Sequence, residues 1–378
     1  MNAFTRKLTA AIPTVLLCAS LSGVNTMSYA ETTNPNAPVS MVEKWDKTFA
    51  ESSRVEHRKV SFHNRYGITL VGDLYLPKNR GQQKLAAIAV SGPFGAVKEQ
   101  SSGLYAQTMA EQGFVTLAFD PSYTGESGGQ PRNVASPDIN TEDFSAAVDF
   151  LGIQKEVDRN RIGILGICGW GGMALNAAAM DTRIKAVATS VMYDMSRAMG
   201  HGVGDGKDRY STADRRAVLQ YLNEQRWKDA ESGTFAHGGH DISVDQNGKV
   251  SAAERILPQT LPASPHPVLK EFFDYYRVPR GFHERSVNST GAWTATMPLS
   301  FMNMPLLSYA NEITIPTLIV TGENAHSRYF AEDAYKAVGS KEKELVVVPG
   351  ANHVDLYDNA AGKIPFARFE QFFKTSLK

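Results

Sequence analysis

Two side chains in this sequence are suited to covalent acyl chemistry. Cys168 follows an apolar run in "GILGICGWGG", and His353 follows another apolar run in "VVVPGANHVD". A thiol can attack a carbonyl carbon when an imidazole takes its proton. A strand, a sharp glycine-bounded turn carrying one nucleophile and then a helix form a nucleophile elbow. We therefore expect Cys168 to be a nucleophile and His353, on the loop after the last strand, to be its base.

The turn around Cys168 matches a nucleophile elbow in its first half only. Gly166 stands two residues before the cysteine, where the strained turn brings neighbouring backbones close. The helix start after Cys168 supplies N–H groups and a positive dipole end, which favour a thiolate and a developing oxyanion. Trp170 stands two residues after the cysteine, where a small residue is expected, and Gly171 follows it. The sequence leaves open whether Trp170 impairs catalysis.

An acyl-transfer site of this kind needs two backbone N–H donors for the oxyanion. The residue after the nucleophile, Gly169, supplies one of them. The other comes from the loop after the apolar run at residues 85–90, which reads Ser-Gly-Pro-Phe-Gly. Pro93 has no N–H group, so we expect Phe94 to be the second donor.

The acid that would orient His353 is the weakest part of the pattern. An aspartate is expected after the apolar run "TLIVTG", but the next residues are Glu-Asn-Ala-His. Glu323 is the nearest carboxylate, and His326 stands where the aspartate is expected. Asp194, after the preceding strand, is the alternative, and a third possibility is that no acid is used. A thiol depends less than a serine hydroxyl on an orienting acid.

Strands that alternate with helices must position these residues. Short apolar runs at 85–92, 114–120, 161–166, 184–194, 315–322 and 343–350 are typical of buried parallel strands. Between them lie segments of helical period, among them 141–151, with Thr141 as a candidate N-cap. Residues 57–77 read as a hairpin around "NRYG". The pattern predicts an α/β fold with a mostly parallel central sheet flanked by helices.

The alternation stops between about residues 196 and 300, where glycine, histidine and aromatic residues are frequent. We expect this segment to be a cap inserted into one domain that spans residues 53–378. Within it, "SVDQNGKVSAAE" imitates a calcium-binding loop, but its first position is a serine, so an Asn-Gly turn is the preferred interpretation. No spacing of histidines, cysteines or acids indicates a metal site.

Three segments carry a resemblance to a known family: residues 92–129, the run "RIGILGICGWGG" and the run "PGANHVD". The sequence resembles the α/β-hydrolase superfamily and its dienelactone-hydrolase-like branch, in which the nucleophile can be cysteine. This resemblance implies an α/β-hydrolase fold, cleavage of an ester, lactone or related acyl bond, and no metal or organic cofactor. A small-molecule acyl substrate is the implied partner.

The N-terminus has the layout of a secretory signal peptide. Arg6 and Lys7 precede an apolar run, and Ser28 and Ala30 flank a candidate cleavage site. We expect residues 1–30 to be removed, residues 31–52 to form an N-terminal arm, and the protein to be periplasmic or secreted. Cleavage would leave Cys168 as the sole cysteine, which excludes an intramolecular disulfide.

The composition is that of an ordinary globular protein. The 378 residues are 42% hydrophobic, with 39 basic and 39 acidic side chains. This balance gives no reason to expect nucleic acid as a partner, and the sequence predicts no stable membrane insertion after cleavage. The oligomeric state is open. Three functions are compatible with the pattern: a hydrolase with a Cys168 acyl-enzyme, an acyl transferase that uses the same site, and an inactive binding protein with this fold.

Overall fold

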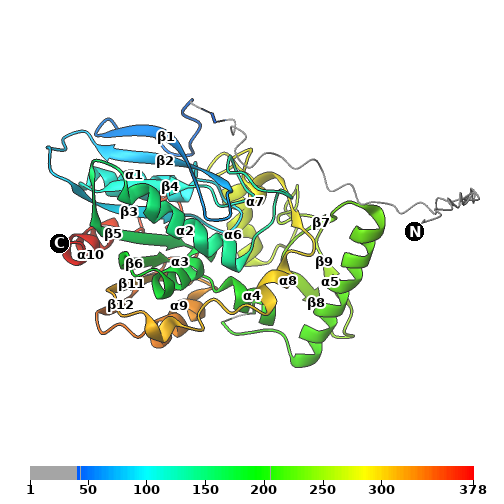
Figure 1. Ribbon diagram of the computed structural model, residues 1–378. Helices are drawn as coiled ribbons and strands as arrows, with labels where there is room; N and C mark the ends of the chain where they lie inside the picture. Colours follow the sequence, from blue (N-terminus) through cyan, green and yellow to red (C-terminus); the bar gives the residue numbers. More distant parts are fainter. Residues whose placement is uncertain (1–40, 43, 205) are drawn as a thin grey trace, which may run out of the picture.

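An eight-stranded sheet forms the centre of the computed structural model, which describes residues 41–42, 44–204 and 206–378 (Figure 1). The strand order is β1-β2-β4-β3-β5-β6-β11-β12; the six strands from β4 to β12 are parallel, and β2 is antiparallel to β1 and β4. The strands are β1 (Val55–His63), β2 (Thr69–Pro77), β3 (Leu85–Ser91), β4 (Val115–Phe119), β5 (Val157–Ile167), β6 (Ile184–Ser190), β11 (Thr317–Gly322) and β12 (Lys343–Val348).

Helices cover both faces of the sheet, which explains why the parallel strands are apolar along their whole length. Side chains of β3 alternate between two hydrophobic clusters: Ala87 and Ala89 belong to one, Ile88 and Val90 to the other. The helices α2 (Pro137–Gly152), α3 (Gly169–Met180) and α9 (Arg328–Ala337) contribute to the first cluster. The helices α1 (Ser101–Glu111) and α10 (Phe366–Ser376) contribute to the second. This architecture confirms the predicted α/β-hydrolase fold.

The start of α2 differs from the prediction. The helix begins at Pro137, four residues earlier than the expected N-cap residue Thr141, which therefore lies inside the helix. The N-cap residue is Ser136, with extended backbone. Proline suits the first helical position because its fixed φ is helical and its missing N–H would have no partner there. The Thr141 hydroxyl instead donates to the Pro137 carbonyl inside the helix.

Small elements between β6 and β11 gather beyond one end of the sheet (Figure 1). They are α4 (Met195–His201), α5 (Thr212–Ser232), β7 (His237–Gly238), β8 (Ile242–Val244), β9 (Val250–Ala252), α6 (Pro267–Tyr276), α7 (Val287–Thr290), β10 (Trp293–Thr294) and α8 (Pro298–Met302). Two short 3-10 helices, η1 (Ala310–Glu312) and η2 (Val354–Leu356), lie before β11 and after β12. We call the segment between β6 and β11 the cap.

The described part of the N-terminal arm packs against the sheet. Lys47 forms an ion pair with Asp73 at 2.6 Å, and the Thr48 N–H donates to the Glu99 carbonyl. The expected signal peptide, residues 1–30, lies outside the described residues. Within the part of the chain that the structure describes, no helix has the length and apolar character needed to cross a membrane.

Candidate active site

Cys168 occupies a strained turn between β5 and α3. Its backbone has φ 55° and ψ −125°, a conformation that residues other than glycine rarely adopt. Hydrogen bonds hold it there: the Cys168 N–H donates to Ser190, and its carbonyl accepts from Tyr193. A Cβ atom at Gly166 would lie 2.1 Å from the Trp170 carbonyl oxygen, so the close approach expected at this glycine is present. Such local strain is typical of functional sites.

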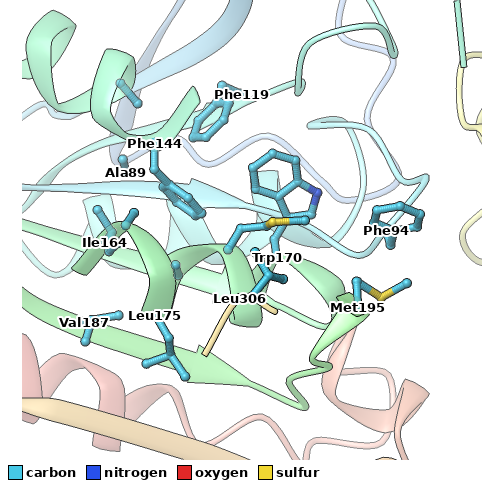
Figure 2. Close-up of a cluster of buried hydrophobic side chains, with 14 of the residues drawn as sticks. Ala89, Phe94, Phe119, Phe144, Ile164, Trp170, Leu175, Val187, Met195 and Leu306 are labelled. Atoms are coloured by element: carbon cyan, nitrogen blue, oxygen red, sulfur yellow. The ribbon is translucent and has the colours of Figure 1, made fainter. Parts of the chain in front are cut away.

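The Trp170 side chain lies within a cluster of buried hydrophobic residues (Figure 2). Its side chain is buried, and its ring packs edge-on against Phe144 and Phe119 at centroid distances of 5.5 and 6.0 Å. The glycines after it allow close contact with the chain beyond β6, because a Cβ at Gly171 would lie 2.4 Å from Met192. The tryptophan therefore packs in the core, and it is not among the residues that line the cavity at Cys168.

The two expected oxyanion donors lie beside the Cys168 thiol. The backbone N–H groups of Phe94 and Gly169 both interact with it and favour its ionised form. A Cβ at Gly169 would lie 2.8 Å from the Cβ of Phe94, so only glycine allows the two donors to approach this closely. The cap fixes the loop from its other side: Asn288 Nδ2 donates to the Phe94 carbonyl at 2.7 Å, and the Ser286 hydroxyl to the Gly95 carbonyl at 3.0 Å.

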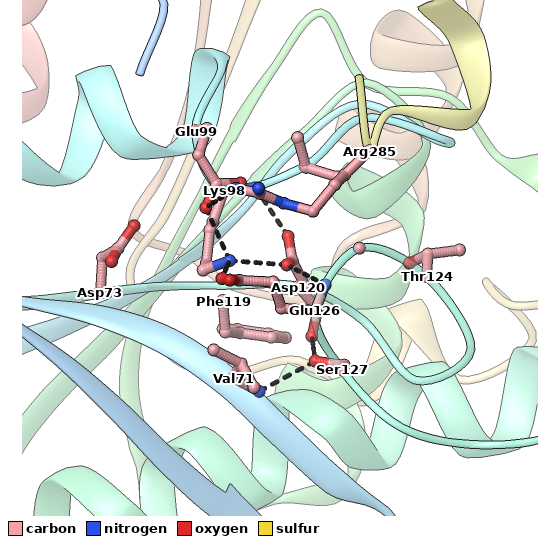
Figure 3. Close-up of polar contacts among 12 residues, drawn as sticks. Val71, Asp73, Lys98, Glu99, Phe119, Asp120, Thr124, Glu126, Ser127 and Arg285 are labelled. Carbon is pink, nitrogen blue, oxygen red and sulfur yellow. Dashed lines mark hydrogen bonds and ion pairs between the residues drawn. The ribbon is translucent and has the colours of Figure 1, made fainter. Parts of the chain in front are cut away.

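A buried ion cluster anchors the same loop from within the core (Figure 3). Lys98 is fully buried, and its ammonium group bonds Asp120 at 2.7 Å, Glu126 at 2.6 Å and Glu99 at 2.8 Å. The Lys98 N–H also donates to Asp120. Arg285 of the cap reaches Glu99 at 3.0 Å. Buried charges need such partners, so the cluster fixes the path of the backbone that carries Phe94.

His353 is buried after β12, with both ring nitrogens engaged. Nε2 lies 2.9 Å from the Tyr357 hydroxyl, and Nδ1 lies 2.7 Å from the Ser327 hydroxyl. The Tyr357 hydroxyl also interacts with the Cys168 thiol. His353 is thus held between the Tyr357 phenol and the Ser327 hydroxyl, and the phenol lies near the Cys168 thiol. With Nδ1 protonated and donating to Ser327, Nε2 is free to accept a proton.

The structure shows no hydrogen bond from His353 to Glu323 or Asp194, the two carboxylates expected to orient it. Glu323 is exposed and accepts the Gly350 N–H at 2.7 Å, because the turn after β11 directs its side chain outward. Asp194 caps α4, where it accepts the Arg197 N–H at 3.0 Å. Among the described residues, neither carboxylate bonds to His353. The uncharged hydroxyl of Ser327, directly before α9, takes that position.

Sequence reasoning missed Tyr357 and Ser327. Tyr357 stands four residues after His353, and the helical turn η2 between them places the two side chains on one face. The signal was the spacing in "HVDLY", but it has meaning only once that loop is known to be helical. His326, where an aspartate was expected, lies beside the site: its ring centroid is 5.0 Å from that of His353, and it bonds the Tyr193 hydroxyl.

Burial favours the uncharged forms of the Cys168 thiol and the His353 imidazole. It raises the pKa of the Cys168 thiol, and the Tyr357 hydroxyl and the two backbone donors offset only part of that rise. Burial, and then the neighbouring His326, lower the pKa of His353 well below its ordinary 6.5. The resting site therefore holds a neutral thiol and a neutral imidazole. Burial thus opposes the thiolate that the helix start is expected to favour.

A cavity of about 490 Å³ opens onto Cys168. This size is ordinary for a small-molecule site. Its lining includes Phe94, Tyr357 and His326, together with many cap residues.

The calcium-like motif lies elsewhere: it forms the β8–β9 hairpin, in which Asp245 accepts the N–H groups of Asn247 and Lys249. The described residues include no group of three or more histidines, cysteines or acids that could hold a metal ion.

Comparison with known proteins identifies the family. A profile described as PET hydrolase-like matches residues 26–216, about half of the chain. The chain belongs to the PET hydrolase-like family. This membership confirms the predicted enzyme class, an α/β hydrolase that acts on esters.

Relatives of this PET hydrolase-like chain agree on the fold. The uncharacterized protein PA2218 of Pseudomonas aeruginosa is 56% identical over 98% of this chain and 94% of its own length. Its crystal structure covers 90% of this chain and 100% of its own, with a TM-score of 0.82. The α/β hydrolase GrgF of a Penicillium species has the same fold, with 19% identity over 85% of this chain and 99% of its own and a TM-score of 0.66.

A shorter stretch of the chain is similar to a fungal enzyme of another reaction type. The polyketide transferase claH of Penicillium crustosum is 34% identical over 35% of this chain and 42% of its own length.

Proposed function

We propose that this protein hydrolyses carboxylic esters or lactones through an acyl-enzyme on Cys168. The observation that carries the proposal is the position of the thiol. It lies at a strained elbow, against the N–H groups of Phe94 and Gly169, and in contact with a hydroxyl that is bonded to His353. The use of cysteine, as in the dienelactone-hydrolase-like branch that the sequence resembles, is part of this proposal.

In the first half-reaction, the Cys168 sulfur attacks the ester carbonyl carbon. The thiol proton passes to the Tyr357 oxygen while the Tyr357 proton moves to Nε2 of His353. The C–S bond forms, and the carbonyl oxygen becomes an oxyanion held by the two backbone N–H groups. Collapse of this intermediate breaks the C–O bond. The proton on the imidazole returns through Tyr357 to the departing alkoxide, which leaves as the alcohol.

In the second half-reaction, water attacks the thioester. The proton of the water passes to the Tyr357 oxygen while the Tyr357 proton moves to Nε2 of His353, the new C–O bond forms, and the oxyanion occupies the same two donors. The C–S bond then breaks, the carboxylic acid leaves, and the proton returns to the sulfur. No metal or organic cofactor is required for either half-reaction.

Acyl transfer is the second candidate function, favoured by the similarity to a polyketide transferase. It shares the first half-reaction and replaces water by an alcohol or an amine. Adding an alcohol acceptor during turnover separates the two: a transferase diverts the acyl group into the new ester, whereas a hydrolase continues to release the acid.

Turnover of a short activated aryl ester by the mature protein, beside the variant Cys168→Ala, tests the proposed function. We expect activity that is lost in Cys168→Ala. Equal turnover by both proteins would exclude the thiol as nucleophile. No Cys168-dependent turnover on esters and lactones of several sizes would favour an inactive binding protein with this fold.

We also propose that the protein is exported to the periplasm or secreted, with cleavage after Ala30. The basic residues, apolar run and small residues of the N-terminal segment support this location. The intact mass of the exported protein tests it: a mass that still includes residues 1–30 would contradict cleavage.

A further inference from the structure

The cap covers the cavity that leads to the Cys168 thiol. All but four of the lining residues belong to the cap; the four others are Phe94, Cys168, His326 and Tyr357. The side chain of Cys168 is only 7% exposed. A carbonyl carbon can therefore meet the sulfur only if the part of the molecule around it fits inside the cavity.

Helix α6 forms one wall of the cavity and runs from its mouth to the thiol. His266, directly before the helix, is exposed; Leu269 and Phe272 are half-buried; and Tyr276 is buried, at 1% exposure. Leu269, Phe272 and Tyr276 all line the cavity. They stand three and four residues apart, so they share one helix face. At 1.5 Å per residue, Leu269 and Tyr276 are about 10 Å apart along the helix axis.

The inner end of this helix face lies against the catalytic groups. The Phe272 ring is 5.5 Å from His353 and 6.4 Å from Tyr357, and the Tyr276 ring is 6.1 Å from Tyr357. Leu269 lies one turn nearer to the mouth. A substrate whose carbonyl lies at the thiol and whose far end lies beside Leu269 must therefore have a chain that passes Phe272.

The rest of the lining combines apolar and polar side chains. It includes Met195, Val203, Ile242 and Leu257. The charged residues of the lining, Arg209 and Asp241, are exposed and so lie at the mouth. Tyr193, His240 and Asn288 also line the cavity and can hydrogen-bond polar substituents, whereas each methylene group buried against Leu269 and Phe272 would strengthen binding by a factor of about four.

We infer that the substrate is a discrete ester with an elongated apolar chain on one side of the carbonyl, laid along the Leu269–Phe272–Tyr276 face of α6. This inference rests on the proposed function and names the substrate class for the same site. It also predicts that this protein does not cleave solid PET, the polymer in the family's name, because an internal ester bond at a solid surface cannot reach the thiol beneath the cap.

Two series of activated esters test the inference. In one the acyl chain grows from acetyl to octanoyl; in the other the alcohol chain grows on a fixed acetyl group. In one of the two series we expect kcat/KM of the wild type to rise with chain length. Leu269→Trp, which fills the middle of the cavity, should lower kcat/KM for the longest ester of that series at least about tenfold and change it for acetyl esters by less than about twofold.

Two further variants make the result specific. Leu269→Ala, which leaves room but removes the wall contact, should lower kcat/KM for the longest ester about fourfold and leave the shortest unchanged. Lys270→Gln is the matched control, because Lys270 lies on the same helix, is exposed and pairs with Asp274 rather than lining the cavity. It should keep the wild-type profile. Melting temperatures confirm that the variants fold.

Three results would overturn the inference. One is the absence of any chain-length preference in both series, and another is an equal loss on short and long esters in Leu269→Trp. The third is release of soluble product from solid PET film above the level of Cys168→Ala. These results would not contradict the proposed Cys168 acyl-enzyme mechanism, provided that short esters are still turned over in a Cys168-dependent way. Loss of that turnover would overturn the proposed function together with the inference.

Discussion

The Tyr357 hydroxyl lies 2.9 Å from Nε2 of His353 and near the Cys168 thiol, so a phenol lies between the proposed base and the proposed nucleophile. Burial, and then the nearby Cys168, raise the pKa of Tyr357 well above its ordinary range. The phenol therefore stays protonated at rest. It can pass a proton onward only by receiving one at the same time, which fits a concerted transfer from sulfur to imidazole.

Tyr357→Phe should interrupt this transfer. We expect kcat to fall about 100-fold, with KM within about threefold of the wild type, because the phenol acts in proton transfer and the ring is retained. Tyr275→Phe is a suitable control: Tyr275 is also buried, its ring lies 5.3 Å from that of Tyr357, and it does not line the cavity. A Tyr357→Phe enzyme with wild-type kcat would show that His353 takes the thiol proton directly.

Ser327 should matter more to catalysis than the two carboxylates suggested by the sequence. Ser327→Ala removes the group that fixes Nδ1 of His353 and should lower kcat about tenfold. Glu323→Gln should leave kcat within about twofold, because this carboxylate bonds only the loop backbone in the described structure.

Asp194→Asn should act on stability at most, by about 1 kcal/mol or less, since Asp194 caps α4. Steady-state kinetics and thermal unfolding of the three variants separate these effects. A larger loss of kcat in Glu323→Gln or Asp194→Asn than in Ser327→Ala would restore an acid to the site.

The pH dependence should reveal a site that is neutral at rest. Catalysis needs unprotonated His353, and activity falls only as the pH drops through its pKa in the folded protein, which lies well below 6.5. We therefore expect kcat/KM at pH 6 to stay within about 20% of its value at pH 7.5. An ordinary histidine would be only about one-quarter unprotonated at pH 6. An acid limb centred near 6.5 would contradict the neutral, buried imidazole.

Alkylation gives an independent check on the thiol. Because the pKa of Cys168 is raised above its ordinary 9.0, iodoacetamide should react slowly at pH 7 and faster as the pH rises past 9. The rate of loss of activity measures this reaction. Rapid inactivation at pH 6 to 7 would indicate a thiolate–imidazolium pair instead.

Lys98 should be essential for stability. Lys98→Met leaves the buried carboxylates of Asp120, Glu126 and Glu99 without their shared cation and should cost about 3 kcal/mol or more of unfolding free energy. Lys374→Met, which removes an exposed ion pair on α10, should cost less than about 0.5 kcal/mol. Urea unfolding of both variants measures the difference. Similar losses for the two would mean that the cluster is not a stability determinant.

The proposed nucleophile and oxyanion donors were predicted from local chain rules, and the structure places them side by side. The strand–turn–helix pattern identified Cys168, and the need for a donor after the nucleophile identified Gly169. The missing N–H of Pro93 then selected Phe94. Each of these inferences needs only a few neighbouring residues. The sheet was predictable for a similar reason, since runs such as 85–92 are apolar without alternation only when both faces are covered.

The remaining contacts depend on how loops fold. Ser327 and Tyr357 meet His353 because a turn after β11 and a helical turn after β12 bring them together, and no residue type or spacing states this in advance. Glu323 was predicted as the acid from proximity in sequence alone. Its side chain bonds the Gly350 backbone instead, a partner 27 residues away. The tryptophan that appeared to disturb the elbow was explained only by the core pocket between Phe119 and Phe144.

Trapping the acyl-enzyme tests the central claim most directly. The protein is mixed with an excess of an activated aryl ester, quenched in acid within one turnover and digested, and the peptides are measured by mass spectrometry. We predict that the mass of the acyl group appears on the peptide that contains Cys168 and is absent from the Cys168→Ala protein. An acyl group found on another residue, or turnover without any adduct, would contradict a Cys168 acyl-enzyme.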